Sequence, residues 1–343
     1  MDLLFGEFIA FLIYATGRDR TCTWITIHRP ERCASANSAT VALQSTILSK
    51  FYYNVTNEVK IMIKLTDSIL KSVIQPRPIN SYKGTFGKVL IIAGDANFGG
   101  AGIMATMAAV YTGSGLVTIA TSKNNFTSIH TNIPEAMAID IQDIPSVINL
   151  AESVNVIAIG PGLDLSEHNL NIINQLITTL DHNQTLILDA SAITLIGKNN
   201  INLNRLKSNL VMTPHLIEWQ RISGLKPAEQ STINNQTKLK QLASQNTELI
   251  LKGAPSHIYS NYDAKVFENN AGSPAMATGG MGDTLTGIMA GFIAQFDFNQ
   301  QTVLAATYLH SYIAKTLAKN NYVVLPTMLI KTLPKIMCEY SKK

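Results

Sequence analysis

The chain has few cysteines and few charged side chains for its 343 residues. Its three cysteines, Cys22, Cys33 and Cys338, have no metal-site spacing and no even-numbered framework, which excludes a disulfide scaffold or a zinc ribbon. Charged residues make up 15% of the chain and give a net charge of +4, and the lysines are scattered rather than gathered in a basic stripe. We therefore expect a cytoplasmic protein with no nucleic-acid partner.

Two common nucleotide-binding motifs are also missing. The sequence has no G-x-x-x-x-G-K-[ST] phosphate loop. Gly100, Gly102 and Ala105 have the spacing of a dinucleotide turn, but the next apolar run continues into "IATSKNN" and lacks the acid that would hold a ribose. A nucleotide site in this chain must therefore be built in another way.

The first 61 residues differ in composition from the rest. They hold four of the seven arginines and two of the three cysteines, whereas the remainder is rich in Lys, Asn and Ile. Their apolar run, LLFGEFIAFLIYATG, contains Glu7, is short for a membrane span and lacks the preceding basic residues of a signal sequence. We predict that residues 1–61 are an extension outside the fold, that Met62 is the functional start, and that no membrane is a partner. A membrane anchor is the less favoured alternative.

From Met62 onward, short apolar runs alternate with segments of helical periodicity. Strands that are apolar throughout are buried on both faces, so the pattern predicts an α/β fold with a mainly parallel central sheet flanked by helices. In such sheets ligands bind at the carboxyl ends of the strands. The apolar runs are residues 88–94, 116–121, 154–160, 185–190, 210–214 and 248–253, and the polar or glycine residues at their ends include Gly94, Gly162, Asp189, His215 and Lys252.

A glycine-rich loop leads directly into an apolar helix in the stretch GSPAMATGGMGDTLTGIMAGFIA, which begins at Gly272. Backbone N–H groups at a helix N-terminus bind anions, and glycines allow a close approach. The predicted anion hole consists of Gly279, Gly280, Met281 and Gly282. Asp283 follows, and it has two interpretations: a helix N-cap, or a general base beside a phosphate site.

Six ordered motifs then carry a family resemblance. They are KGTFGKVLIIAGDANFGGAGIMA, GPGL, LDASAITLI, TPHLIEWQRI, LKGAPSHI and GSPAMATGGMGDTLTGIMAG. The chain resembles the ADP-dependent (S)-NAD(P)H-hydrate dehydratase family of the ribokinase-like superfamily. The resemblance covers residues 62–343 and implies one ribokinase-like domain there, a three-layer α/β sandwich. It implies a carbon–oxygen lyase that repairs hydrated nicotinamide cofactors.

The resemblance also implies roles for individual residues. Asp283 matches the family's catalytic base. The residues that match its contacts to the hydrated dinucleotide are Ala101, Gly162, His215 and Asp283, and those that match its contacts to the adenine nucleotide are Lys252, Gly253, Ala254, Pro255, Ser256 and Gly282. Structural alternatives remain open: His215 as a helix-start residue paired with Glu218, and Lys252 as a strand-end surface charge. A zinc site at His215 and Glu218 would lack a third ligand, so we predict no metal-binding side chains.

The implied reaction uses ADP as a phosphoryl donor. Transfer of its terminal phosphoryl group to the hydroxyl at C6 of the hydrated ring creates a good leaving group, and elimination restores NADH or NADPH with release of AMP and phosphate. Asp283 would deprotonate the hydroxyl, the loop amides would stabilise the phosphoryl oxygens, and Mg²⁺ would be held by phosphate oxygens and water. The resemblance further implies a homotetramer. The rival interpretations are a small-molecule kinase of the same superfamily and a non-catalytic nucleotide-sensing protein.

Four positions depart from the family's usual residues. Asp164 stands where the family has glycine, and we expect its charge to affect affinity for a phosphate-bearing ligand or the choice between hydrated NADH and NADPH. The other three are Phe98 for Tyr, Ser191 for Asp and Ser256 for Thr. Ser256 keeps the hydroxyl, so we expect little effect on nucleotide contact.

Overall fold

The computed structural model describes residues 62–342. The predicted extension, residues 1–61, lies outside the described residues, and its separation from the fold stays a prediction. No helix among residues 62–342 is long and apolar enough to cross a membrane.

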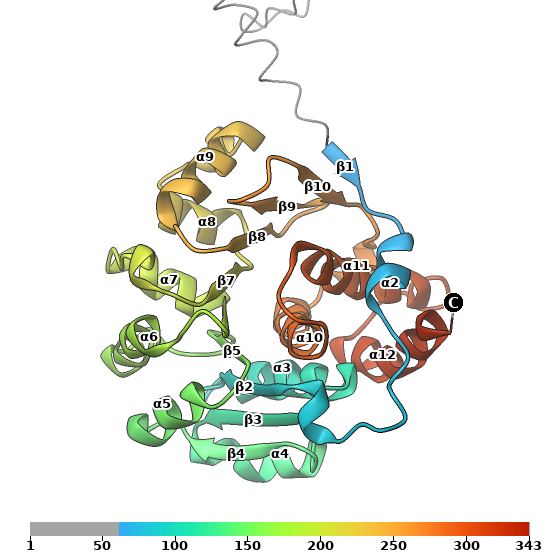
Figure 1. Cartoon of the computed structure of the whole chain (residues 1–343), viewed down its shortest axis with the longest axis horizontal. Coiled ribbons are helices and arrows are strands. Elements are labelled where there is room, and N and C mark those ends of the chain that lie inside the picture. Colours follow the sequence, from blue (N-terminus) through green and yellow to red (C-terminus); the bar gives the residue numbers. More distant parts are fainter. Residues whose placement is uncertain (1–61, 343) are drawn as a thin grey trace, which may run out of the picture. The chain divides into compact units, whose positions relative to one another are not determined.

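The described strands form one ten-stranded sheet in the order β1-β10-β9-β8-β7-β6-β5-β2-β3-β4 (Figure 1). All neighbours are parallel except β9, which is antiparallel to both β8 and β10. This confirms the predicted mainly parallel sheet. The strands are β1 Met62–Lys64, β2 Lys88–Ile92, β3 Leu116–Thr121, β4 Met137–Asp140, β5 Val156–Ile159, β6 Thr185–Leu188, β7 Asn209–Met212, β8 Thr247–Leu251, β9 Ser256–Ser260 and β10 Val266–Asn269.

Helices cover both faces of the sheet and complete the three layers (Figure 1). One face carries α5 Ile144–Glu152, α6 Glu167–Thr179, α7 Ala190–Lys198, α8 Leu216–Ser223 and α9 Thr232–Leu242. The other carries α2 Ser68–Val73, α3 Gly99–Thr112, α4 Phe126–Asn132, α10 Met281–Phe296, α11 Gln300–Leu317 and α12 Pro326–Ser341. Short 3-10 helices lie at η1 Lys83–Phe86, η2 Lys123–Asn125, η3 Leu203–Arg205, η4 Pro227–Glu229 and η5 Pro274–Met276.

Each face of the sheet has its own hydrophobic core. Along β2, Val89 and Ile91 pack with the α3 and α10 side, whereas Leu90 and Ile92 pack with the α5 to α9 side. Successive side chains of a strand point to opposite faces, so a strand that is apolar throughout fills both cores. The continuous apolar runs in the sequence reflect this double burial.

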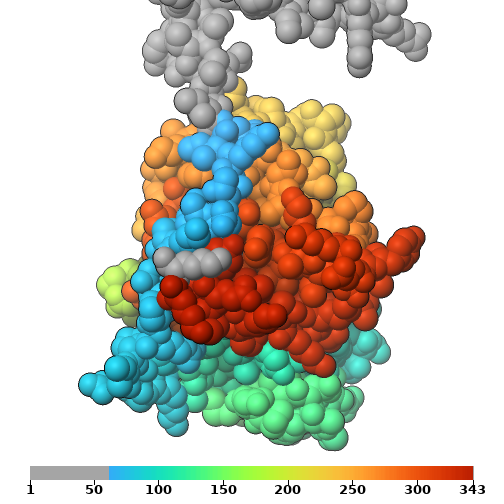
Figure 2. All heavy atoms as spheres, turned by 90° about the vertical axis from the view of Figure 1, so that its right-hand side faces the viewer, coloured from blue at the N-terminus to red at the C-terminus, as the bar shows by residue number. Residues whose placement is uncertain are grey.

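The segment after β1 belongs to the folded unit. Figure 2 shows it running along the face formed by α11 and α12. In α2, Leu70 and Val73 are buried in the same core as α11 and α12, and β1 pairs with β10 from Met62 onward. The fold therefore uses residues from the very start of the described chain.

Helix α10 packs closely against α3. A Cβ added at Gly287 of α10 would lie 2.0 Å from the backbone oxygen of Ala105 in α3. Only glycine allows this approach. Both helices begin at the carboxyl edge of the sheet, so this contact fixes the glycine-rich loop above the strand ends.

Candidate active site

The carboxyl ends of five neighbouring strands gather the predicted site residues. The strand order places β8, β7, β6, β5 and β2 side by side, so the loops that follow them lie along one edge. The loops after β7 and β8 are joined directly: His215 forms a parallel bridge with Lys252, and the Lys252 N–H donates to the Pro214 carbonyl at 2.8 Å.

The α10 N-terminus supplies unpaired amides. Gly280 is its N-cap residue with φ 94°, and no side chain caps the helix. Within residues 62–342, no hydrogen bond uses the N–H groups of Met281, Gly282 or Asp283, and the first bond of the turn is from Thr284 N–H to the Gly280 carbonyl at 3.0 Å. In contrast, α5, α6, α9 and α11 begin with an Asp, Ser or Asn side chain that accepts a helix N–H. The open amides suit an anion.

Asp283 lies in the first turn of α10 and is not the N-cap. This placement removes the capping alternative, since Gly280 occupies that position. The Asp283 side chain is half-buried. Burial and, to a lesser degree, the negative charge of Asp189 raise the pKa of Asp283, the positive charge of Lys252 opposes them, and the net result is a pKa of about 6. A carboxylate with a pKa near neutral pH is suited to accept a proton from a hydroxyl.

Lys252 is held by an acid that the sequence did not assign to the site. Its Nζ lies 2.8 Å from Asp189 Oδ1 and 4.0 Å from Glu218 Oε2. The interpretation of Lys252 as a free surface charge therefore does not hold. Burial acts against its charge, but the two acids outweigh this and raise its pKa above the usual value. The sequence identified Asp189 only as a polar residue at a strand end. Its pairing with Lys252 could not be predicted, because the pairing depends on the order of the strands in the sheet.

His215 and Glu218 form the start of α8. The His215 N–H donates to Glu218 Oε2 at 2.9 Å, and the N–H groups of Ile217 and Glu218 donate to His215 Nδ1 at 3.1 and 3.3 Å. This is a reciprocal capping arrangement, so the structural alternative for His215 is present. His215 Nε2 remains on a side chain that is 49% exposed, 3.3 Å from Glu218 Oε1. Residues 62–342 contain no group of three His, Cys, Asp or Glu that could hold a metal ion.

The first turn of α3, which follows β2, and the loop after β5 bring Ala101 and Gly162 together. Gly162 has φ 63°, and a Cβ there would lie 2.5 Å from the Phe98 carbonyl oxygen and 2.8 Å from the Ala101 Cβ. The Asp95 N–H donates to the Gly162 carbonyl at 2.8 Å. The two predicted substrate contacts thus lie side by side, one in the first turn of α3 and one in the loop after β5.

The predicted nucleotide-binding loop, residues 252–256, turns tightly between β8 and β9. Ser256 Oγ accepts from the Gly253 N–H at 3.2 Å and donates to the Gly253 carbonyl at 3.1 Å. Its Ala254–Pro255 peptide bond is cis. Gly282 faces this region, because a Cβ added there would lie 3.4 Å from Lys252 Nζ. Four predicted elements therefore meet: the α10 loop, residues 252–256, the His215 turn and the end of β6.

Known proteins match most of the length of this sequence. A family model described as NAD(P)H-hydrate dehydratase matches residues 89–335. The chain belongs to the NAD(P)H-hydrate dehydratase family. It is 42% identical over 280 residues to an ADP-dependent (S)-NAD(P)H-hydrate dehydratase of Lactococcus lactis, covering 81% of this chain and 99% of the relative. An enzyme of the same name from Enterococcus faecalis is 41% identical over 278 residues, covering 81% and 94%.

Solved structures of family members share the fold. A ribokinase-like superfamily protein from Enterococcus faecalis is 40% identical, with a TM-score of 0.77, covering 82% of this chain and 97% of the other. An ADP/ATP-dependent NAD(P)H-hydrate dehydratase from Bacillus subtilis, co-crystallised with ATP and Mg²⁺, is 27% identical, with a TM-score of 0.71, covering 81% and 99%. The ribokinase-like three-layer fold is thereby confirmed.

Asp164, which departs from the family's usual residue, is engaged at the start of α6. Its carboxylate accepts from the Ser166 N–H at 3.1 Å and from Asn169 Nδ2 at 2.7 Å. The Ser166 side chain is the largest influence that lowers the pKa of Asp164, and the hydrogen bonds from the Ser166 N–H and from Asn169 lower it too. The charge of Asp164 is thus used in a local turn. Phe98, another departure, is 64% exposed beside Gly162.

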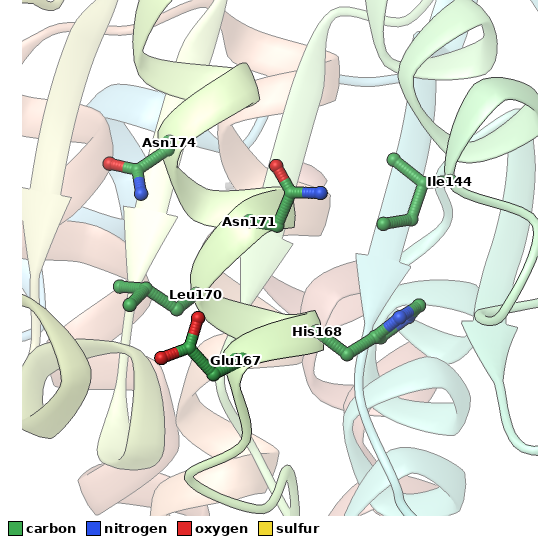
Figure 3. Close-up of a pocket in the computed structure, with 6 residues that line it drawn as sticks. All are labelled: Ile144, Glu167, His168, Leu170, Asn171 and Asn174. Atoms are coloured by element: carbon green, nitrogen blue, oxygen red, sulfur yellow. The ribbon is translucent and has the colours of Figure 1, made fainter.

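Two hollows on the described surface contain none of the predicted site residues. One of about 450 Å³ lies between α5 and α6 and is lined by Ile144 of α5 and by residues of α6 that include Glu167, His168 and Asn171 (Figure 3). The other, of about 770 Å³, is lined by the carboxyl-terminal ends of α3 and α10, opposite the glycine-rich loop. The candidate active site is therefore identified by its family motifs and chemistry rather than by cavity size.

Proposed function

We propose that the chain catalyses the ADP-dependent dehydration of the S epimer of hydrated NADH and NADPH, with release of AMP and phosphate. The observation that carries this proposal is the first turn of α10, where three unpaired amides adjoin the half-buried Asp283 carboxylate and the Lys252 ammonium. Relatives about 40% identical over nearly their whole length are named for this reaction, which supports the assignment.

Each element has a separate task in this proposal. Lys252 and the loop to Ser256 bind the adenine nucleotide with Gly282, while Ala101, Gly162 and His215 bind the hydrated dinucleotide. The amides of residues 279–282 hold the transferred phosphoryl group, whose oxygens gain charge during the transfer. Asp283 takes the proton from the C6 hydroxyl. The phosphoryl group then leaves C6 with that oxygen as phosphate, C5 loses a proton to water, and the C5–C6 double bond of the ring returns.

Mg²⁺ fits this site only as a companion of the nucleotide. The described residues offer no set of three metal ligands, so the ion would arrive bound to phosphate oxygens and water. It would neutralise phosphate charge there. The Bacillus subtilis relative was co-crystallised with ATP and Mg²⁺, which supports this part of the proposal.

We also propose that the enzyme works in the cytoplasm as a homotetramer. The scarcity of cysteine in the sequence favours a reducing compartment. Light scattering on the purified full chain would measure the assembly, and a monomer would contradict this part.

A product assay separates the proposal from its two rivals. The full chain is incubated with Mg²⁺ and the prepared S epimer of hydrated NADH, (S)-NADHX. Three reactions run in parallel: one contains ADP, one contains ATP, and one contains no nucleotide. We expect the absorbance of the reduced nicotinamide to return with ADP, together with one AMP and one phosphate for each NADH. A small-molecule kinase of the same superfamily would leave a stable phosphate ester without that absorbance, and a non-catalytic sensor would bind ADP and produce neither.

A further inference from the structure

Asp189, the residue that follows β6, is a buried carboxylate beside the glycine-rich loop. It is 1% exposed. Its Oδ1 accepts from Lys252 Nζ at 2.8 Å, and its Oδ2 accepts from Thr286 Oγ1 on α10 at 2.8 Å. The next residue, Ala190, has φ 46°, a left-handed conformation that is unfavourable for a residue with a side chain. The chain accepts this strain at the point where it places Asp189.

The Asp189–Lys252 pair lies directly behind the start of α10. A Cβ added at Gly282 would be 3.4 Å from Lys252 Nζ and 3.9 Å from Asp189 Oδ2. The pair therefore joins the ends of β6 and β8 to the turn that contains Asp283. Lysine has a long flexible side chain, and a buried carboxylate partner fixes where its charge lies.

We propose that Asp189 is a positioning residue for the reaction: it holds the Lys252 ammonium against the first turn of α10. There the cation adds its positive charge to the phosphate-binding amides and attracts the Asp283 carboxylate. This inference rests on the proposed function. The competing explanation is an ion pair that only stabilises the packing of α10. The two explanations differ in what happens to the proton equilibrium of Asp283.

The charges around Asp283 are few, which makes the difference measurable. Asp189 and Lys252 act on its carboxyl group in opposite directions. Glu218, on α8, lies 4.0 Å from Lys252, and His215 lies beyond it at 3.3 Å from Glu218. On the opposite side, α3 packs along α10 without a charged side chain. On α11, burial lowers the pKa of His310 to about 4, so this group is neutral at the working pH.

The test is the pH profile of kcat/KM for (S)-NADHX at saturating ADP, measured on the full chain. Asp189→Asn removes the negative charge that raises the pKa of Asp283, and it leaves the Lys252 ammonium free to attract the Asp283 carboxylate. The acid limb of the pH profile should therefore move to lower pH by about one unit or more. Lys252→Met keeps the side-chain length but removes the cation, so the limb should move up by about as much. Opposite shifts are the result that supports the proposal.

Two further variants keep the test decisive. Glu248→Gln makes the same acid-to-amide change at a buried carboxylate at the other end of β8, and it should leave the limb in place. If Asp189→Asn does not fold, the double variant Asp189→Asn/Lys252→Met leaves no unpaired buried charge, and its limb should lie below that of Lys252→Met. The inference would be overturned if variants that still turn over had the acid limb of the pH profile at the same pH as the wild type. A wild type without turnover would instead contradict the proposed function.

Discussion

Asp189 and Glu248 are two buried carboxyl groups whose pKa values are shifted in opposite directions. Burial opposes ionisation of Asp189, but Lys252 and hydrogen bonds outweigh it and hold its pKa below the usual value. Glu248, in β8, receives hydrogen bonds only from Ser260 Oγ and the Tyr262 hydroxyl, and its Oε2 has no partner among the described residues. Burial therefore raises its pKa to about 7. The fold therefore favours the charged form of Asp189, at the edge of the sheet that carries the candidate site, and disfavours the charged form of Glu248, at the other end of β8.

Glu248 predicts a pH dependence of stability. Its pKa is higher in the folded protein, about 7, than its ordinary value of 4.5, so the folded state binds the proton more tightly. The stabilisation of the folded state by the protonated Glu248 side chain is complete below pH 4.5 and is lost as the pH rises towards 7. The corresponding change in the free energy of unfolding is on the order of 3 kcal/mol. Glu248→Gln should flatten the fall in free energy of unfolding between pH 5 and pH 8 measured in urea. An unchanged fall would show that Glu248 is ionised or solvated in the folded protein.

The glycine-rich element has glycines of two kinds. A Cβ at Gly280 would lie 2.3 Å from Met104 Sδ, and its φ of 94° already disfavours any other residue. A Cβ at Gly279 would meet nothing within 4 Å, and its φ is not left-handed. Packing therefore explains Gly280 but not Gly279, whose place in the proposed anion hole stays a prediction.

This contrast gives a paired prediction. Gly279→Ala should leave the melting temperature unchanged and weaken ADP binding, because its methyl group would occupy the space of the bound phosphate. Gly280→Ala should lower stability by about 1 kcal/mol or more from the backbone strain alone. Calorimetry with ADP and thermal unfolding on both variants would measure the difference. Equal ADP affinity in Gly279→Ala and the wild type would remove this residue from the anion hole.

At the scale of elements, the sequence predicts β2, β3, β5, β6, β7 and β8, because strands buried on both faces are apolar throughout. It does not predict β1, β4, β9 or β10. β9 and β10 are SHIYS and VFEN, short strands in which polar residues interrupt the apolar ones, and β1 and β4 are edge strands of three and four residues. Such segments have no distinctive composition. The partner of Lys252 was missed for a related reason: the order of β6, β7 and β8 in the sheet brings Asp189 to it, and order is not a local property of the sequence.

At the scale of the whole molecule, residues 62–342 contain both cores and the complete candidate site. β1 begins at Met62 with the pair to Val266, and α2 packs into the core that α11 and α12 share. A chain that begins at Met62 should therefore keep the melting temperature, and kcat/KM should stay within about twofold of the full chain, the size of a change of about 0.4 kcal/mol. Loss of soluble protein or a large fall in activity would assign residues 1–61 a role in folding or catalysis.

The proposed reaction depends on one proton transfer to Asp283. Asp283→Asn keeps the shape of the side chain and leaves the amides of α10 in place, but an amide cannot accept the proton. It also removes a half-buried charge that Asp189 repels, so thermal stability should be equal or higher. ADP binding should survive, because the helix N-terminus is unchanged.

The most direct test is the rate of NADH formation from (S)-NADHX and ADP by Asp283→Asn, with both substrates saturating. We predict a fall of about 10²- to 10⁴-fold, the usual contribution of a positioned general base. A rate within about tenfold of the wild type, well below that contribution, would show that Asp283 is not the base and would contradict the proposed mechanism.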